Sequence, residues 1–221
     1  MLMLCRMACV GGEVIDYKIG SHHDFNNQQK VRVDLFLDIV GGKQQKPNSQ
    51  TIISHLRDDS DKQMVHAQSE EFRWFKINGK PDYLLMDNYS ELVDKKITHK
   101  DGWSFCAEYG DLKPEFFDDG TFTDHGLLSI NKIYESYDLF FTYVKNKWNI
   151  PIIFIHFSTA LDTREKYINQ GMAITAALEK LSPKYNIQNI HADLDSIERR
   201  DGDCYHFGKK TIKNMADKIV M

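Results

Sequence analysis

The 221-residue chain has few of the residues that cross-link or interrupt a fold: four cysteines and five prolines. The cysteines, at positions 5, 9, 106 and 204, include no C-x-x-C pair. A disulfide framework is therefore not expected, and reduced thiols in the cytoplasm are the simplest prediction. The prolines do not cluster and the chain has no repeat or low-complexity tract, which favours a single domain over residues 1–221.

Positive charge is also scarce, since 28 Lys and Arg residues stand against 32 Asp and Glu residues and give a formal net charge of -4. This balance predicts no nucleic-acid partner. No apolar run reaches the length of a membrane span. The apolar opening run contains Arg6 and is followed at once by Glu13 and Asp16, which argues against a secretory leader. We therefore expect a cytoplasmic protein without a membrane span.

Hydrophobic residues make up 42% of the chain, enough to bury a core, and they gather in short runs. The runs predicted to be strands are residues 2–10, 31–40, 82–87, 151–157 and 187–192. In the second run, alternate positions from 31 to 39 are apolar, which is typical of a half-buried strand. The first and fourth runs are continuously apolar, which is typical of central strands in a parallel sheet.

Helical patterns lie between these runs. Residues 129–148 carry apolar side chains at three- and four-residue spacing. Residues 162–181 begin with Asp162 three positions before Glu165, as in a capping box. Residues 208–221 form a short amphipathic pattern. Alternation of strands and helices predicts an α/β fold, a three-layer sandwich with a mostly parallel central sheet.

Functional residues of such sheets gather at the carboxyl ends of the strands. The first predicted strand ends at Cys9 and is followed by Gly11 and Gly12. Because glycines lack Cβ, their backbone can approach a substrate and direct N–H groups at an oxyanion. A thiol at the start of a helix is expected to have a lowered pKa. Cys9 is thus a candidate nucleophile, and a buried cysteine before a turn is the alternative.

Two other segments carry candidate site residues. The third predicted strand ends in Asp87-Asn88, where Asn88 could donate its amide to an oxyanion or could cap a turn or helix. Near the end of the chain, Asp203 and His206 precede the last predicted helix. A carboxylate at this spacing can orient the imidazole and leave its Nε2 free as a general base. Cys204 and His206 could contribute to a metal site, but no second ligand pair supports zinc.

The stretch "IGSHHDF" offers a second candidate nucleophile, Ser21, beside His22 and His23. Adjacent side chains do not form a triad by adjacency alone, so Ser21 ranks after Cys9.

The order of these blocks resembles the SGNH/GDSL hydrolase superfamily. The chain is similar to divergent members found near bacterial surface-polysaccharide genes, whose first block reads Gly-Ser-Cys or Gly-Asn-Cys. The segments that carry the resemblance are "ACVGGE", "SDKQMVHAQSEEFRWFKINGKPDYLLMDNYSEL", "IIFIHFSTALDTREKYINQ" and "DGDCYHFGKK". The first block departs from the pattern because Met7 stands where the family has glycine, and the middle block lacks its glycine at Met86.

The resemblance implies a flavodoxin-like, SGNH-like fold and an acyl-ester hydrolase or acyltransferase acting on carbohydrate-linked acyl groups in surface-polysaccharide modification. It assigns Cys9 as nucleophile, His206 as general base and Asp203 as its orienting group. The expected oxyanion or substrate contacts are Gly11, Gly12 and Asn88. No cofactor or metal is required, although coenzyme A could serve as acyl donor. The alternative, favoured by the missing glycines, is a catalytically degenerate SGNH-like protein that binds a glycan or a partner.

Overall fold

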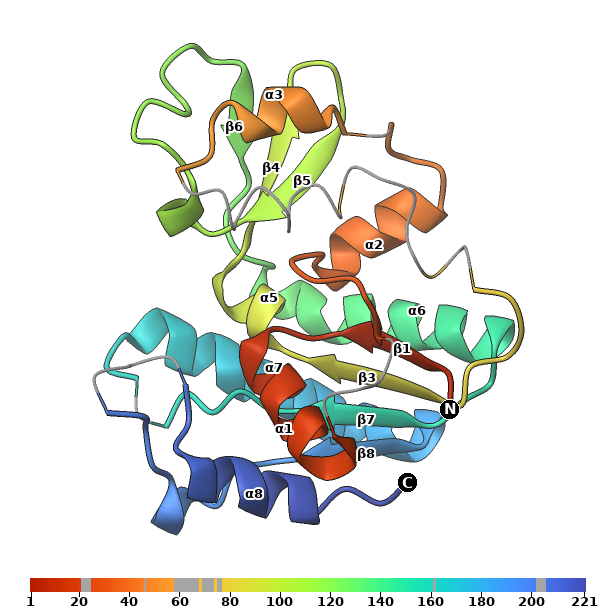
Figure 1. The fold of residues 1–221 in the computed structure, drawn as a ribbon. Coiled ribbons are helices and arrows are strands. Elements are labelled where there is room, and N and C mark those ends of the chain that lie inside the picture. Colours follow the sequence, from red (N-terminus) through yellow and green to blue (C-terminus); the bar gives the residue numbers. More distant parts are fainter. Residues whose placement is uncertain are drawn as a thin grey trace.

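Figure 1 shows the fold of the chain in a computed structural model. The structure describes residues 1–20, 25–45, 47–57, 68, 74, 77–160, 162–201 and 206–221, without the side chains of residues 25 and 26. In this part of the chain no helix has the length and apolar character needed to cross a membrane.

The larger of two sheets consists of five parallel strands (Figure 1). Their spatial order is β2 (Phe25–Asn27), β1 (Met3–Arg6), β3 (Tyr83–Asp87), β7 (Ile152–Ile155) and β8 (Ile187–Ile190). The register pairs Cys5 with Leu85 and Leu85 with Ile153. Because all five strands run in one direction, the loops that follow them meet at one edge of the sheet, called here the carboxyl edge.

Helices cover both faces of this sheet (Figure 1). They are α1 (Cys9–Ile19) and α8 (Lys209–Asp217) on one face, and α6 (Ile130–Lys147) and α7 (Glu165–Tyr185) on the other. Successive strand side chains point to opposite faces, so Leu84 and Met86 pack with α6 and α7 while Leu85 packs with α1 and α8. The predicted α/β fold with a parallel sheet is confirmed.

A second, three-stranded antiparallel sheet was not predicted. It contains β5 (Ser104–Ala107), β4 (Lys95–His99) and β6 (Phe122–Asp124), in that order, and follows the short helix α5 (Tyr89–Val93). Its own core includes Ile97, Trp103 and Phe105, which pack with Ile52 of α3 (Ser49–Ile53). Two 3-10 turns, η2 (Tyr109–Asp111) and η3 (Leu194–Ser196), complete the described elements.

The prediction of a strand at residues 31–40 is wrong, because residues Val33–Val40 form helix α2. The same segment has apolar residues at Val33, Phe36, Leu37 and Val40, which is helical spacing. Tertiary contacts favour the helix: the ring of Phe36 packs edge-on against that of Phe140 on α6, with centroids 5.1 Å apart. The strand prediction considered only the apolar residues at odd positions and did not use Phe36 and Val40, which are also apolar.

The three predicted helices are present as α6, α7 and α8, but α7 starts differently from expectation. Its N-cap residue is Arg164 and makes no side-chain capping bond. Asp162 instead accepts hydrogen bonds from the backbone N–H of Arg164 at 2.9 Å and from its guanidinium at 2.9 and 2.7 Å. The capping box between Asp162 and Glu165 is therefore not formed.

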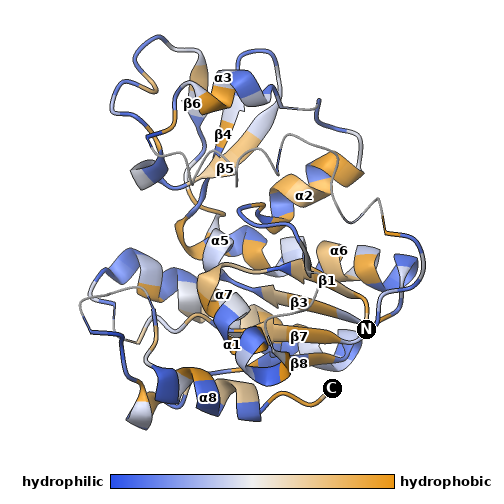
Figure 2. Ribbon diagram, in the orientation of Figure 1, coloured by the Kyte–Doolittle hydropathy of each residue, from blue (hydrophilic) through white to orange (hydrophobic). Residues whose placement is uncertain are grey.

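Hydropathy follows the layers of the fold. Figure 2 shows mainly hydrophobic residues in the strands of the parallel sheet and many hydrophilic residues on α8. On α8 the side chains of Thr211, Ile212, Met215 and Ala216 are buried, so one stripe of the helix faces the sheet.

A buried arginine ties the end of β1 to its surroundings. Arg6 is 2% exposed, and its guanidinium donates to the carbonyl oxygens of Val31 at 2.6 Å and Asp87 at 3.2 Å. It also forms an ion pair with the fully buried Glu91 of α5. These contacts hold β1, β3 and the segment before α2 together at the carboxyl edge.

The carboxylate of Glu91 has two further donors. It accepts the backbone N–H of Val33 at 2.9 Å and the hydroxyl of Tyr137 on α6 at 3.0 Å. Burial and the adjacent carboxylate raise the pKa of Tyr137 well above its ordinary value, so the hydroxyl stays protonated as a donor. A buried charge is stable when it is paired and hydrogen-bonded in this way.

We expect Glu91→Gln to lower the free energy of unfolding by about 3–5 kcal/mol, because Arg6 would be left as an uncompensated buried charge. Urea denaturation followed by circular dichroism measures the change. The control is Asp217→Asn, which breaks an exposed ion pair with Lys213 and should cause little or no change. Equal losses in the two variants would contradict a dominant role for the buried pair.

Candidate active site

The first helix begins immediately beyond the carboxyl end of β1. Arg6 ends the strand, and Cys9 is the first residue of α1. The carboxylate of Asp87, at the end of β3, accepts the backbone N–H groups of Ala8 at 2.7 Å and Tyr89 at 3.1 Å. Asp87 therefore joins the starts of α1 and α5, and places the Cys9 thiol at the carboxyl edge.

A pocket of about 240 Å³ lies at this edge. Side chains from both ends of the chain and from its middle line it, among them Cys9, Lys30, Tyr89, Glu108, Phe157 and His206. Cys9 is exposed, and His206 is half-buried. The structure thus brings the predicted nucleophile and the predicted base to one pocket, which is called the Cys9 pocket below.

Arg200 connects His206 to α1. The guanidinium of Arg200 donates to the two carboxylate oxygens of Glu13 at 2.8 and 2.9 Å. The backbone N–H of Arg200 donates to the carbonyl oxygen of His206 at 3.1 Å. Glu13 is four residues after Cys9 and so lies on the same face of α1. The helix that presents the thiol therefore also holds Arg200, to which His206 is hydrogen-bonded.

The pKa of the Cys9 thiol is raised, so the expected lowering is wrong. Loss of solvent around the sulfur is the largest cause, and the carboxylates of Glu13 and Asp87 raise the pKa further. The N–H of Cys9 and the ammonium of Lys30 act in the opposite direction. The resting thiol is therefore protonated near neutral pH, and a base must remove its proton during any nucleophilic attack.

The two predicted oxyanion glycines do not line the Cys9 pocket within the described part of the chain. Gly11 is buried against Asp87: a Cβ at this position would lie 2.6 Å from the Asp87 Oδ2 atom and 3.0 Å from the Cβ of Met7. At Gly12 a Cβ would have no described atom within 4 Å. Gly11 is thus required for the approach of Asp87 to α1, whereas nothing described crowds Gly12.

Asn88 is 1% exposed and its Oδ1 accepts the backbone N–H of Phe157 at 2.7 Å. This bond links the residue after β3 to the segment after β7. Asn88 is not among the described residues that line the Cys9 pocket. Asp203, Ser21 and Cys204 lie outside the described residues. Within those residues, no group of three His, Cys, Asp or Glu side chains is placed to hold a metal ion.

Sequence reasoning missed a charged wall of the Cys9 pocket. Lys30 pairs with Asp111, and Glu108 lies beside them. Burial, and then the neighbouring Asp111, raise the pKa of Glu108. Beneath this wall, burial raises the pKa of Asp94 to about 7. Glu108 and Asp111 follow β5 of the unpredicted antiparallel sheet, Asp94 immediately precedes its strand β4, and Lys30 lies between β2 and α2, so the predicted strand ends did not indicate them.

A second pocket, of about 620 Å³, shares Phe157 with the Cys9 pocket. It lies beyond the ends of β7 and β8, where the rings of His156 and His191 stack with centroids 4.0 Å apart. His156 is buried, and burial lowers its pKa to about 3, so the ring is neutral. His156 is therefore a buried, neutral residue of the core.

Comparisons of the chain with models of protein families, with curated proteins and with solved structures found no match.

We expect Gly11→Ala to lower the free energy of unfolding by about 1–3 kcal/mol, because the added methyl group collides with Asp87. Gly12→Ala is the matched control, in the same helix but with room for the methyl group. It should raise stability by about 0.5–1 kcal/mol, since alanine favours the helix. Thermal and urea unfolding measure both changes, and destabilisation by Gly12→Ala as large as that by Gly11→Ala would refute the assignment.

The raised pKa of Cys9 predicts slow alkylation at neutral pH. Iodoacetamide reacts with the thiolate, so the labelling rate should increase with pH and reach its midpoint above the ordinary thiol value of 9.0. Mass spectrometry after timed labelling gives the rate at Cys9. The buried Cys5 and Cys106 serve as internal controls and should stay unlabelled while the protein is folded. A rate that is independent of pH between 7 and 9 would show a pre-formed thiolate instead.

Proposed function

We propose that the chain is an acyl-transfer enzyme that acts on acyl esters of carbohydrates by hydrolysis or by transfer, with Cys9 as nucleophile and His206 as general base. The observation that carries the proposal is the Cys9 pocket itself. A thiol and an imidazole from opposite ends of the chain line one cavity at the carboxyl edge of a parallel sheet. This is the edge at which open α/β folds bind their ligands.

The arrangement of the parallel sheet also supports the proposal. Numbered along the chain, its five strands stand in the order 2-1-3-4-5, the order of flavodoxin-like folds. With helices on both faces, this order supports a three-layer, SGNH-like sandwich. The antiparallel sheet is then an insertion between β3 and β7, and its Glu108 contributes to the pocket wall.

The proposed reaction has two steps. In the first, His206 takes the thiol proton as the sulfur of Cys9 attacks the ester carbonyl carbon. The bond from that carbon to the alcohol oxygen breaks, and the alcohol leaves with the proton from the imidazolium, so that the acyl group remains on Cys9 as a thioester. In the second, water or the hydroxyl group of an acceptor attacks the thioester and regenerates the thiol. Because the thiol is protonated at rest, the mechanism requires this base.

Backbone groups at the start of α1 are available to bind the oxyanion. The first N–H groups of a helix have no partner within the helix. Those of Cys9 and Val10 belong to residues that line the pocket. They take the role that the sequence assigned to Gly11 and Gly12. No step requires a cofactor; coenzyme A would be the acyl donor if the protein is a transferase.

A binding protein without catalysis is the second candidate. Two observations favour it: the raised pKa of Cys9, and the use of the Ala8 N–H by Asp87. Both reduce the reactivity of the site towards an ester. The same pocket, with the aromatic rings of Tyr89 and Phe157 and the charged Lys30, would then hold a glycan or another polar ligand.

Ester turnover tests the proposal. We expect the protein to hydrolyse p-nitrophenyl acetate and glucose pentaacetate, or to transfer acetyl groups from acetyl coenzyme A to glucose. Cys9→Ala and His206→Ala should each lower the rate by about a hundredfold or more, because each removes a group that moves in the reaction. Intact-mass analysis should detect an acetyl adduct that is absent from Cys9→Ala.

The control is His125→Gln, which removes an exposed histidine outside the Cys9 pocket and should keep the full rate. Unchanged turnover in Cys9→Ala and His206→Ala would refute the catalytic assignment. If the protein shows no turnover but binds a glycan saturably, and Cys9→Trp abolishes that binding, the protein is a binding protein instead.

A further inference from the structure

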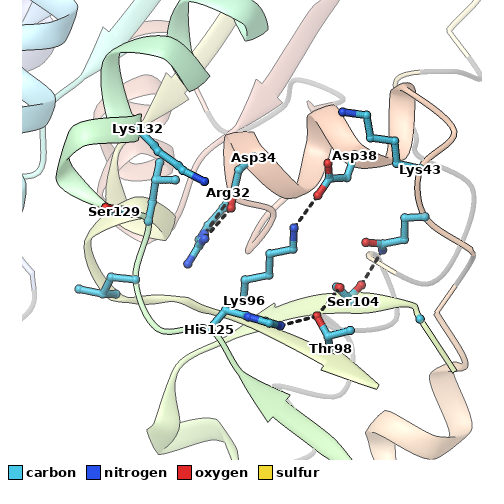
Figure 3. Close-up of a pocket in the computed structure, with 14 residues that line it drawn as sticks. Arg32, Asp34, Asp38, Lys43, Lys96, Thr98, Ser104, His125, Ser129 and Lys132 are labelled. Carbon is cyan, nitrogen blue, oxygen red and sulfur yellow. Dashed lines mark hydrogen bonds and ion pairs between the residues drawn. The ribbon is translucent and has the colours of Figure 1, made fainter. Parts of the chain in front are cut away.

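A pocket of about 530 Å³ lies between the antiparallel sheet and the helices α2 and α6 (Figure 3). Its lining and that of the Cys9 pocket have no residue in common among the described positions. We call it the cationic pocket, because four of its lining side chains are cationic: Arg32, Lys43, Lys96 and Lys132. Its volume is in the range of small-molecule sites.

The cationic pocket has an excess of positive charge on an acidic chain. Two carboxylates, Asp34 and Asp38, face the four cations, which leaves two positive charges in excess, whereas the whole chain carries -4. Asp34 is held by the guanidinium of Arg32 at 2.9 and 2.6 Å, and Asp38 pairs with Lys96. Both carboxylates are therefore already neutralised within the pocket.

The two remaining cations come from different elements. Lys43 follows α2, and Lys132 lies in the first turn of α6. Neither makes an ion pair with a residue of the described part of the chain. In Figure 3 the side chain of Lys132 extends towards Arg32. Because Arg32 is already paired with Asp34, an anion bound at this place would compensate mainly the charge of Lys132.

Further polar side chains complete the lining. His125 Nε2 lies 2.9 Å from the hydroxyl of Thr98, which lies 2.8 Å from the hydroxyl of Ser104 (Figure 3). Ser129 is the N-cap residue of α6, whose first turn contains no acidic residue. The positive end of the helix dipole therefore adds to the lysine charges without an opposing carboxylate in that turn.

We propose that the cationic pocket binds the phosphate group of a small molecule. A phosphate monoester carries close to two negative charges at neutral pH, which matches the excess charge. Its oxygens accept hydrogen bonds in several directions, as ammonium groups and hydroxyls from separate elements can supply. The volume leaves room for an organic group attached to the phosphate.

Calorimetric titration tests the proposal with inorganic phosphate and glucose 1-phosphate as probes, at ionic strength held constant with sodium chloride. We expect saturable binding of both and none of glucose. Tighter binding of glucose 1-phosphate would assign an organic phosphate, and equal binding would assign free phosphate as the ligand. Lys43→Ala and Lys132→Ala should each weaken the Kd by about tenfold, since each removes a charged donor.

Three further variants test whether the charges of this pocket determine the affinity for phosphate. Lys180→Ala removes an exposed lysine on α7, outside the pocket, and should leave the Kd unchanged. Lys132→Arg keeps the charge and should retain binding. Asp38→Asn removes a carboxylate and releases Lys96, so it should tighten binding. Folding of each variant is checked by circular dichroism.

No saturable phosphate binding by the unmodified protein, or the same Kd in Lys43→Ala, Lys132→Ala and Lys180→Ala, would overturn the proposal. The rate of Cys9 alkylation should not change in the lysine variants, because the two pockets are separate. Loss of phosphate binding and loss of ester turnover can therefore be distinguished.

Discussion

The buried ion pair between Arg6 and Glu91 is the interaction on which the carboxyl edge depends. Paired charges tolerate an interior only when hydrogen bonds satisfy their remaining donors and acceptors. Here those bonds reach the backbone before α2, the end of β3 and the hydroxyl of Tyr137 on α6. The pair thereby fixes where the chain leaves β1 and β3. The Cys9 pocket and the cationic pocket are both lined by residues of the segments that follow β1, β2 and β3.

Asp87 connects the end of β3 to the start of α1. Its carboxylate is buried, and desolvation raises its pKa to about 6 although it accepts two backbone N–H groups. The close approach is possible because Gly11 has no Cβ. The same approach brings a negative charge near Cys9 and helps to raise the pKa of the thiol. One packing contact therefore positions the Cys9 thiol and contributes to keeping it protonated at rest.

Sequence patterns predicted the strands and helices whose apolar residues form a continuous run or recur at a regular spacing. The runs predicted as strands at 82–87 and 151–157 contain β3 and β7, interior strands of the parallel sheet whose two faces are both covered. The antiparallel sheet was missed because β4 buries alternate residues of which two, Lys95 and His99, are polar. The segment 31–40 was mistaken for a strand because it satisfies both periodicities, and only packing of Phe36 on α6 selects the helix.

The sequence by itself determined the α/β class, the approximate extent of α6, α7 and α8, and a short set of candidate site residues that included Cys9 and His206. Only the tertiary structure decided that these two line one pocket, that Asp87 occupies the space beside Gly11, and that four cations line another pocket. The reason is physical. Local periodicity reports which face of an element is buried, whereas contacts, solvent exposure and pKa values depend on segments that are distant in the chain.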